Sequence, residues 1–401
     1  MRFSWLLLAL FSVGAQAKFM IPGFELVHTV PVETSLETPD LREPVQVWCQ
    51  QFDKAKRQID IAQFYATSKK GEPLEKVMSH LREAGERGVH IRFLMDAHGV
   101  SISDPKTIEQ LKSIPHLTFK LIDYHKVSGG IIHAKYFVVD GKSAYMGSQN
   151  FDWRSLKEIH ETGLLITDAK VVKQLQAIFD IDWHLQQQLA QGKPLLALNQ
   201  HVELANEHEL NYLVASPNAY NPPGVGDSQS ELPRLLAKAK KSVRIMVMTY
   251  APLSYSTHHP RPYYALIDTA IRAAAQRGVK IQLMVSNWNT GHPDIDYLKS
   301  LDVLPNIEVK IVTIPQSKSG FIPYARVLHS KTMDIDNKIA WVGTSNWEGG
   351  YMDNSRNLEI VMQNETMAER IGELHEQLWN SPYAKPFLID KDYPQPHPGH
   401  E

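Results

Sequence analysis

The sequence is short of several features, and each shortage excludes a class of protein. Its 401 residues contain one cysteine, Cys49, so no disulfide can form within the chain. Its 42 basic and 44 acidic residues give a net charge of −2, which is not the charge of a protein that coats nucleic acid through a globally basic surface. Its 18 histidines never show the His-x₃-His spacing typical of zinc ligands, so no metal site is expected.

Long hydrophobic runs are also missing, and the longest apolar stretch lies at the N-terminus. Arg2 supplies a positive start, residues 3–13 are apolar, and Ala15-Gln16-Ala17 is a small-residue cleavage site. The run is too short to span a bilayer comfortably, so it predicts a cleavable signal peptide over residues 1–17, with an uncleaved anchor as the alternative. An exported protein without disulfides fits a bacterial periplasm or secretion, with Lys18 as the first mature residue.

The chain does contain one pattern twice, His-x-Lys-x₄-Asp-x₆-Gly-Ser/Thr-x-Asn, once in each half. The first copy comprises His133, Lys135, Asp140, Gly147, Ser148 and Asn150, and the second comprises His329, Lys331, Asp336, Gly343, Thr344 and Asn346. Two imidazoles, two ammonium groups and two amides are the groups that phosphodiester cleavage needs when no metal takes part.

Each copy has the pattern of two strands joined by a turn. Residues 131–140 are rich in β-branched and aromatic side chains, and they end at an Asp-Gly turn signal before a return strand over 143–148. Side chains alternate along a strand, so His133 and Lys135 share a face. Residues 327–336 and 338–346 repeat the plan. We therefore expect each half to supply part of one symmetric phosphate pocket.

Further repeats indicate a duplicated domain. The segment from Ala55 to Tyr65 matches Ala239 to Tyr250, and the Arg-Gly-Val strand that starts at Arg87 matches the one at Arg277. Strands alternate with helices in both halves, which predicts an α/β protein: two pseudo-symmetric α/β/α sandwich domains with the active site at their interface. The expected boundaries are 1–17 for the signal peptide, 18–190 and 211–385 for the domains, 191–210 for a linker and 386–401 for a C-terminal tail.

The repeated pattern is the signature of the phospholipase D superfamily. The segment from Tyr145 to Leu156 resembles the branch that contains mammalian phospholipase D family members three and four, as do residues 246–285, 322–327 and 343–347. That branch is described as cleaving single-stranded nucleic acid from the 5′ end, with lipid transfer also proposed. Its members are luminal and disulfide-bonded, whereas this chain has no second cysteine.

The residue types suggest a mechanism in two steps. One imidazole attacks phosphorus and forms a covalent phosphohistidine, and the other protonates the leaving oxygen and then activates water. Lys135, Lys331, Asn150 and Asn346 would stabilise charge on the non-bridging oxygens, so no metal or cofactor is needed. The resemblance implies that His133 is the nucleophile and His329 the acid.

Four more residue pairs are candidates for the site. Glu161, 11 residues after Asn150, and Glu359, 13 residues after Asn346, are expected to orient the two imidazoles. Asp140 and Asp336 are assigned to the catalytic set by the pattern, although a hydrogen-bonding role at the turns is an equal alternative. Ser148 and Thr344 either donate to phosphate or satisfy backbone groups. Trp347 and Tyr351 either stack on bases or pack in the core.

The sequence thus predicts a monomeric phosphoric diester hydrolase whose partner is a phosphodiester substrate. A nuclease acting on single-stranded nucleic acid is the first hypothesis, on the resemblance. A phospholipase D or transphosphatidylase acting on phospholipid head groups is the alternative, although no amphipathic docking helix stands out. A binding protein without activity is the third hypothesis, and two intact motifs argue against it.

Overall fold

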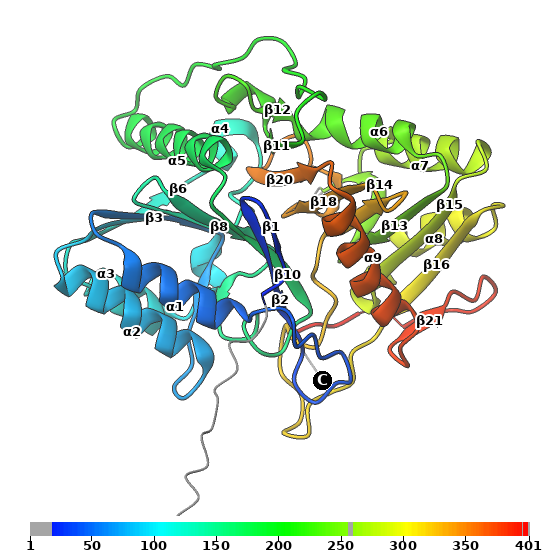
Figure 1. Ribbon diagram of the computed structural model, residues 1–401, viewed down its shortest axis with the longest axis horizontal. Coiled ribbons are helices and arrows are strands. Elements are labelled where there is room, and N and C mark those ends of the chain that lie inside the picture. The colour runs from blue at the N-terminus through cyan, green and yellow to red at the C-terminus, as the bar shows by residue number, and fades with distance from the viewer. Residues whose placement is uncertain (1–17, 256–259, 395, 400–401) are drawn as a thin grey trace, which may run out of the picture.

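The computed structural model describes residues 18–255, 260–394 and 396–399. The leader expected over residues 1–17 lies outside the described residues. Two large β-sheets, each covered by helices, form the two halves of the molecule (Figure 1). The architecture is therefore the α/β duplication that the repeats predicted. Within the described ranges, no helix combines the length and apolar character needed to cross a membrane.

The first sheet has eight strands in the order β1-β2-β10-β8-β7-β3-β5-β6. Only the β3-β5-β6 side of this sheet is parallel, and the other pairings are antiparallel. The strands are β1 (Met20–Ile21), β2 (Phe24–Thr29), β3 (Gln58–Gln63), β5 (His90–Asp96), β6 (Leu117–Ile122), β7 (Tyr136–Val139), β8 (Ser143–Gly147) and β10 (Glu161–Ile166).

The second sheet repeats this order as β12-β11-β20-β18-β17-β13-β15-β16-β21. Its strands are β11 (Asn211–Ser216), β12 (Gly226–Asp227), β13 (Ser242–Met246), β15 (Lys280–Ser286), β16 (Ile307–Val312), β17 (Thr332–Ile335), β18 (Ile339–Gly343), β20 (Asn357–Met362) and β21 (Ala384–Pro386). Two short parallel pairs complete the strands, β4 (Ala66–Thr67) with β9 (Phe151–Asp152) and β14 (Tyr250–Ser254) with β19 (Trp347–Gly349). The equivalent strand order places the two motifs in equivalent positions.

The helices form two outer layers and one shared inner layer. In the first half they are α1 (Pro44–Lys54), α2 (Pro73–Glu86), α3 (Pro105–Lys112), α4 (His125–Ser128) and α5 (Ala169–Ala190), and in the second α6 (Ser228–Lys238), α7 (Leu266–Gln276), α8 (Asp294–Asp302) and α9 (Glu365–Trp379). One hydrophobic core lies under α1–α3 and another under α6–α8. A third core joins α5, α9 and the inner faces of both sheets, so apolar burial holds the two halves together.

The repeated Arg-Gly-Val segments have the same structural task in both halves. Gly88 and Gly278 follow the ends of α2 and α7 with φ of 86° and 89°, a left-handed conformation that favours glycine at a helix end. The preceding arginines hold the C-terminal end of a neighbouring helix. Arg87 donates to the carbonyl of Phe52 at 2.7 Å, and Arg277 donates to that of Leu236 at 2.9 Å. This part of the repeat therefore ends one helix and fixes it against its neighbour in each half.

Residues 191–210, between α5 and β11, contain no helix or strand. At the other end of the second half, β21 adds to β16 as an antiparallel edge strand. The chain beyond β21 returns to the loop that precedes the second motif, where the Tyr324 amide donates to the carbonyl of Pro398 at 2.8 Å. The described part of the tail thus packs beside a segment that borders the active site.

Candidate active site

The backbone before each motif strand crosses to the opposite half. The amides of His133 and Ala134 donate to the carbonyl of Arg356 at 3.0 and 2.8 Å, and those of His329 and Ser330 donate to the carbonyl of His160, both at 2.9 Å. These cross-links explain a difference from the sequence prediction. The strand expected over residues 131–140 begins only at Tyr136, because the preceding backbone bonds to the other half instead of its own sheet.

The crossing brings the two motifs to one cavity between the halves. His133, Asn150, His329 and Asn346 all line this cavity, whose volume is 630 Å³. Lys135 and Lys331 are buried beneath the histidines, and each ammonium group donates to the carbonyl of the histidine two residues earlier, Lys331 at 2.7 Å. The structure therefore brings together the histidine, lysine and asparagine of both motifs.

Burial and neighbouring charges lower the pKa values of the lysines and histidines of both motifs. Burial lowers the pKa of Lys331 to about 7. Burial and the charge of Lys331 lower the pKa of Lys135 well below its usual value. Burial, reinforced by the two lysines, also holds the pKa values of His133 and His329 well below 6.5. Two imidazoles that stay neutral near two ammonium groups suit the binding of one phosphate anion.

The far nitrogens of the imidazoles meet different partners. His329 Nδ1 lies 2.7 Å from Glu161 Oε2, and His133 Nδ1 lies 3.0 Å from Asn357 Oδ1. Each partner belongs to the half opposite its histidine and opens a strand, Glu161 in β10 and Asn357 in β20. The carboxylate expected for one imidazole is therefore in place, and burial raises its pKa to about 8. The other imidazole has a carboxamide partner.

Glu359 does not have the orienting role that the sequence predicted for it. Its carboxylate accepts hydrogen bonds from Ser228 and Ser345, and burial raises its pKa to about 7. Glu359 lies two residues beyond Asn357 in β20, which is about 7 Å further along the strand. The spacing could have identified Asn357 as the equivalent of Glu161, because it follows Asn346 by the same 11 residues that separate Glu161 from Asn150.

Asp140 and Asp336 do not lie in the cavity, so their assignment to the catalytic set is corrected. The Asp140 carboxylate accepts the backbone amides of residues 56–58 at 2.8–2.9 Å, and Asp336 accepts those of residues 240–242 at 2.7–2.8 Å. Both have left-handed backbones, with φ of 54° and 56°. Each therefore ties the motif turn to the start of β3 or β13, the fold-stabilising alternative.

The hydroxyl groups of the motifs support the site from behind. Ser148 donates to the carbonyl of Thr162 at 3.2 Å and accepts its amide at 3.0 Å. Thr344 donates to Asn357 Oδ1 at 2.8 Å and accepts the amide of Leu358 at 3.0 Å. Both side chains are fully buried, so direct donation to phosphate is not their role here. In contrast, Asn150 and Asn346 line the cavity, and an amide nitrogen is a group that can donate to a phosphate oxygen.

Aromatic side chains surround His133 and the cavity mouth. The rings of Tyr351 and Phe64 lie 4.8 and 6.0 Å from the His133 ring. Tyr324 also lines the cavity, and its side chain is 54% exposed. Trp347 is fully buried and packs edge-on against Trp341, so it belongs to the core. Of the two aromatic residues singled out after the second motif, only Tyr351 faces the site.

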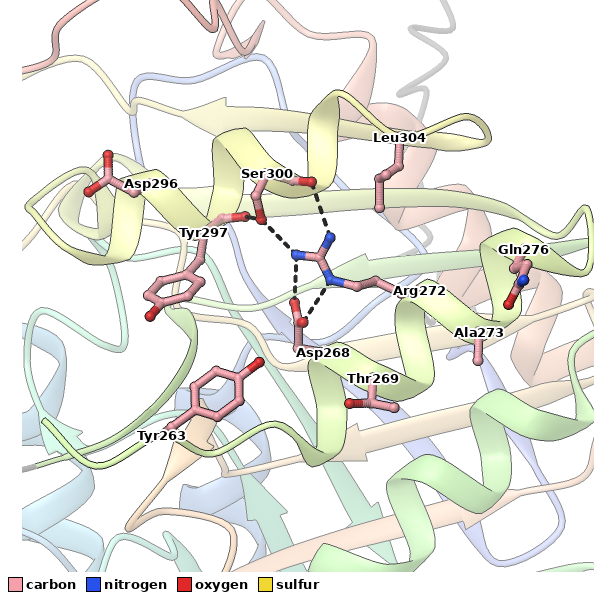
Figure 2. Close-up of a pocket in the computed structure, with 10 residues that line it drawn as sticks. All are labelled: Tyr263, Asp268, Thr269, Arg272, Ala273, Gln276, Asp296, Tyr297, Ser300 and Leu304. Atoms are coloured by element: carbon pink, nitrogen blue, oxygen red, sulfur yellow. Dashed lines mark hydrogen bonds and ion pairs between the residues drawn. The ribbon is translucent and has the colours of Figure 1, made fainter.

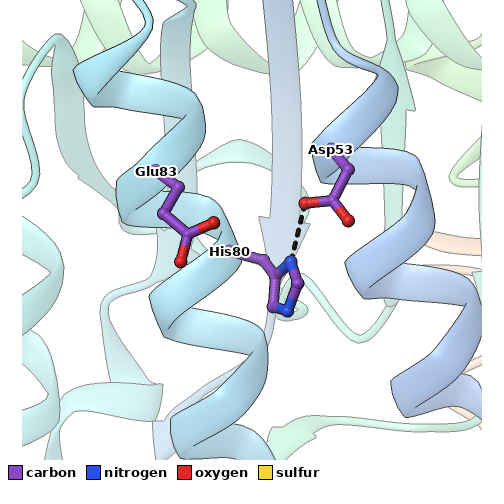
Figure 3. A group of neighbouring side chains, drawn as sticks. All are labelled: Asp53, His80 and Glu83. Atoms are coloured by element: carbon purple, nitrogen blue, oxygen red, sulfur yellow. Dashed lines mark hydrogen bonds and ion pairs between the residues drawn. The ribbon is translucent and has the colours of Figure 1, made fainter.

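Two other places hold polar groups, and neither is organised for a phosphodiester. A hollow beside α7 and α8 contains Arg272, but its guanidinium already donates hydrogen bonds to Asp268 and Ser300 (Figure 2). On α1 and α2, the ligand atoms of Asp53, His80 and Glu83 lie within 4.8 Å of one another (Figure 3). There His80 Nδ1 lies 2.6 Å from Asp53 Oδ1, at hydrogen-bonding distance, and Glu83 adds a further carboxylate beside them.

Comparison with known proteins finds relatives that are similar over most of this chain. A sequence model of the family described as "Cardiolipin synthase, PLD-like domain" matches residues 48–183 and 232–379. The 5'-3' exonuclease PLD3 of Xenopus laevis is 31% identical over 91% of this chain and 81% of its own. Phospholipase D Z of Dictyostelium discoideum is 31% identical over 91% of this chain and 90% of its own. The 5'-3' exonuclease PLD4 of Mus musculus is 28% identical over 90% and 78%.

A solved structure shares the fold at lower identity. Phosphatidylserine synthase of Haemophilus influenzae superposes with a TM-score of 0.58 at 12% identity, and the match covers 86% of this chain and 85% of that one. The duplicated architecture thus recurs in another enzyme at very low sequence identity.

Proposed function

The chain belongs to the phospholipase D-like family, and from that membership and the cavity geometry we propose a metal-independent phosphodiesterase that works through a covalent phosphohistidine. The observation that carries the proposal is the meeting of two imidazoles and two buried ammonium groups at one cavity. These groups supply a nucleophile, an acid and the positive charge that a phosphoryl transition state requires.

The reaction proceeds in two balanced steps. Nε2 of one imidazole attacks phosphorus, the bond to the leaving oxygen breaks, and the other imidazole gives its Nε2 proton to that oxygen. The second imidazole then takes a proton from water, whose oxygen attacks phosphorus. The phosphorus–nitrogen bond breaks, which frees the first imidazole and releases a phosphate monoester. Lys135 and Lys331 offset the charge on the non-bridging oxygens in both steps.

We assign single-stranded nucleic acid as the substrate. Two of the similar proteins described above carry the name 5'-3' exonuclease. The exposed Tyr324 and the cavity-lining Tyr351 offer ring faces on which unpaired bases stack. The positive charge at the cavity comes from the buried Lys135 and Lys331 and from Arg154, which is paired with Asp152, so we expect binding to depend on a few local phosphate contacts. One chain supplies both motifs, so we propose that a monomer is active.

The first experiment offers purified protein a 5′-hydroxyl single-stranded oligonucleotide and phosphatidylcholine vesicles in parallel, with EDTA present. We expect mononucleotide release from the oligonucleotide at a rate that the chelator does not change. Choline release without nucleotide release would instead establish the phospholipase alternative. Loss of all turnover in EDTA, restored by zinc or magnesium, would contradict the metal-independent mechanism.

Trapping experiments test the covalent step. We expect acid-quenched wild-type enzyme to carry substrate phosphorus on a histidine, and His133→Ala to carry none. His329→Ala should retain labelling by a p-nitrophenyl ester, whose leaving group needs no proton. Reversed behaviour of the two variants would exchange the roles of the histidines.

Export is part of the same proposal. We propose that residues 1–17 are removed as a signal peptide in a bacterial periplasmic or secreted protein. N-terminal sequencing of the exported form should begin at Lys18, and a form that begins at Met1 would instead favour an anchor.

A further inference from the structure

The two halves differ at one position where symmetry would place the same chemistry. Glu161 and Asn357 each follow a motif asparagine by 11 residues, open equivalent strands and contact Nδ1 of the opposite histidine. Both side chains are fully buried. One of them can ionise and the other cannot, so the two imidazoles have different proton-holding partners.

The contacts of Asn357 fix which end of its amide faces His133. Nδ2 lies 2.8 Å from the carbonyl of Tyr351, which accepts hydrogen bonds but cannot donate. The amide nitrogen is therefore committed to that carbonyl, and Oδ1 faces both the Thr344 hydroxyl and His133 Nδ1. Because an amide oxygen only accepts, Nδ1 of His133 must carry a proton. In the neutral ring, the second nitrogen, Nε2, is then a bare lone pair.

The partner of His329 allows the opposite state, because a carboxyl group can hold a proton and an amide oxygen cannot. Burial raises the pKa of Glu161 to about 8, which favours a Glu161–His329 pair that holds two protons near neutrality. One of them is on Nε2, and the other lies between the two groups, either on the carboxyl group or on Nδ1. If the carboxyl group holds it, Nδ1 accepts a hydrogen bond and the neutral ring carries its own proton on Nε2. If Nδ1 holds it, the ring is an imidazolium and both nitrogens are protonated. In either case Nε2 of His329 has a proton to give.

We propose that Asn357 is a positioning residue that locks His133 as the nucleophile and leaves His329, paired with Glu161, as the acid. The inference rests on the proposed phosphodiesterase function and assigns the order of events within it. The two histidines of the pseudo-symmetric site therefore cannot exchange roles, because the imidazole of His133 presents a lone pair and that of His329 presents a proton.

The other groups around His133 favour the same state. Lys135 follows His133 by two residues in the same motif, Lys331 and His329 face His133 from the second motif, and the ring of Tyr351 contacts it edge-on. The lysines disfavour a second positive charge, and Asn357 offers no negative charge to offset them. The acidic carboxyl group of the site, Glu161, is engaged with His329.

The test is the pH profile of kcat/KM for Asn357→Asp, measured with a p-nitrophenyl ester of thymidine monophosphate. An aspartate of nearly the same shape adds a carboxylate beside His133 Nδ1 and stabilises its protonated form. We expect the acid limb to move upward by about 1–3 pH units, the usual effect of an opposite charge at contact distance. An acid limb that coincides with that of wild type would overturn the inference.

Glu161→Gln is the matched variant in the other half. It should slow cleavage of an oligonucleotide, whose leaving group needs a proton, far more than cleavage of the p-nitrophenyl ester. Equal losses on the two substrates would contradict the acid role of His329.

A measurement on the wild-type protein covers the case in which a variant does not fold. In ¹⁵N-histidine NMR spectra, assigned by difference with His133→Ala, neutral His133 should show a protonated Nδ1 and a bare Nε2. The reverse tautomer would overturn the inference without reference to activity. Absence of phosphodiester hydrolysis in a protein with the expected tautomer would instead contradict only the proposed function.

Discussion

The two buried ammonium groups, Lys331 and Lys135, set the upper pH limit expected for the reaction, because the pKa of each is lowered. The pKa of Lys331 is lowered to about 7 by burial, so its charge is present below pH 7 and is lost as the pH rises through that value. The Glu161 pKa of about 8 places loss of the pair's shared proton slightly higher. The lowered pKa of His133 keeps the nucleophile neutral well below pH 6.5. We therefore expect a bell-shaped kcat/KM profile with a mildly acidic optimum, and a rate that climbs steadily to high pH would contradict it.

The motif aspartates allow a contrasting prediction, in which stability changes and chemistry does not. Asp140→Asn keeps a side chain that tolerates the left-handed backbone but loses the charge that accepts three amides. We expect a loss of about 1–3 kcal/mol in the free energy of unfolding, measured with urea. The kcat of the folded enzyme should stay close to wild type, and Asp336→Asn should behave alike. A large fall in kcat at unchanged stability would return these residues to the catalytic set.

These residues also show how far a sequence can specify a site. The histidines, lysines, asparagines and Glu161 were predictable because their spacing is fixed along local strands. Asn357 was missed because a carboxylate was expected, and Glu359 was the nearest one. The backbone amides that donate to Asp140 come from 82–84 positions away in the chain, and such long-range contacts leave no local pattern.

The loop before the second motif gives a prediction about substrate recognition. The Arg154 guanidinium donates to the carbonyl of Pro323 at 2.8 Å and lies 5.9 Å from the Tyr324 ring, while the C-terminal tail holds the Tyr324 amide. These contacts present the tyrosine at the cavity mouth. Tyr324→Ala should weaken oligonucleotide cleavage by about 1–3 kcal/mol in kcat/KM, the value of one stacked base. Hydrolysis of a small p-nitrophenyl diester should change little.

Tyr263 provides the control, because it is 65% exposed but lies in the separate hollow of Figure 2. Tyr263→Ala should leave both substrates unaffected. Equal effects of the two variants on the oligonucleotide would remove the stacking assignment.

Strands were predictable where their composition and their repetition in the two halves indicate extended backbone, as in β3, β5 and their repeats β13 and β15. The segments before Tyr136 and Thr332 have the composition of strands but pair with the other half. Their β-branched residues report extended backbone correctly. Which strand or loop accepts the hydrogen bonds of that backbone depends on how the two domains pack together, and the sequence does not show this.

A fully buried ion pair also joins the two halves. Arg356, from the second half, lies 2.9 Å from Asp182 on α5 of the first half, and both side chains have 0% exposure. The carbonyl of the same arginine accepts the His133 amide. Asp182→Asn or Arg356→Met should destabilise the protein by roughly 3–5 kcal/mol, because each strands a buried charge.

The double variant Asp182→Leu with Arg356→Met should recover much of that loss in a urea titration, since it removes both charges together. Additive losses in the double variant would show that packing around the two side chains, and not their charge, joins the halves.

Each histidine takes its partner from the opposite half, and this determines whether a dimer of one half alone could form the site. If two first halves assembled about the same axis, each His133 would face a glutamate, and in two second halves each His329 would face an asparagine. Neither homodimer would hold one bare and one protonated imidazole. With Asn357 in its proposed role, the two halves supply different partners to the two histidines. Neither half could therefore form the same site by pairing with a second copy of itself.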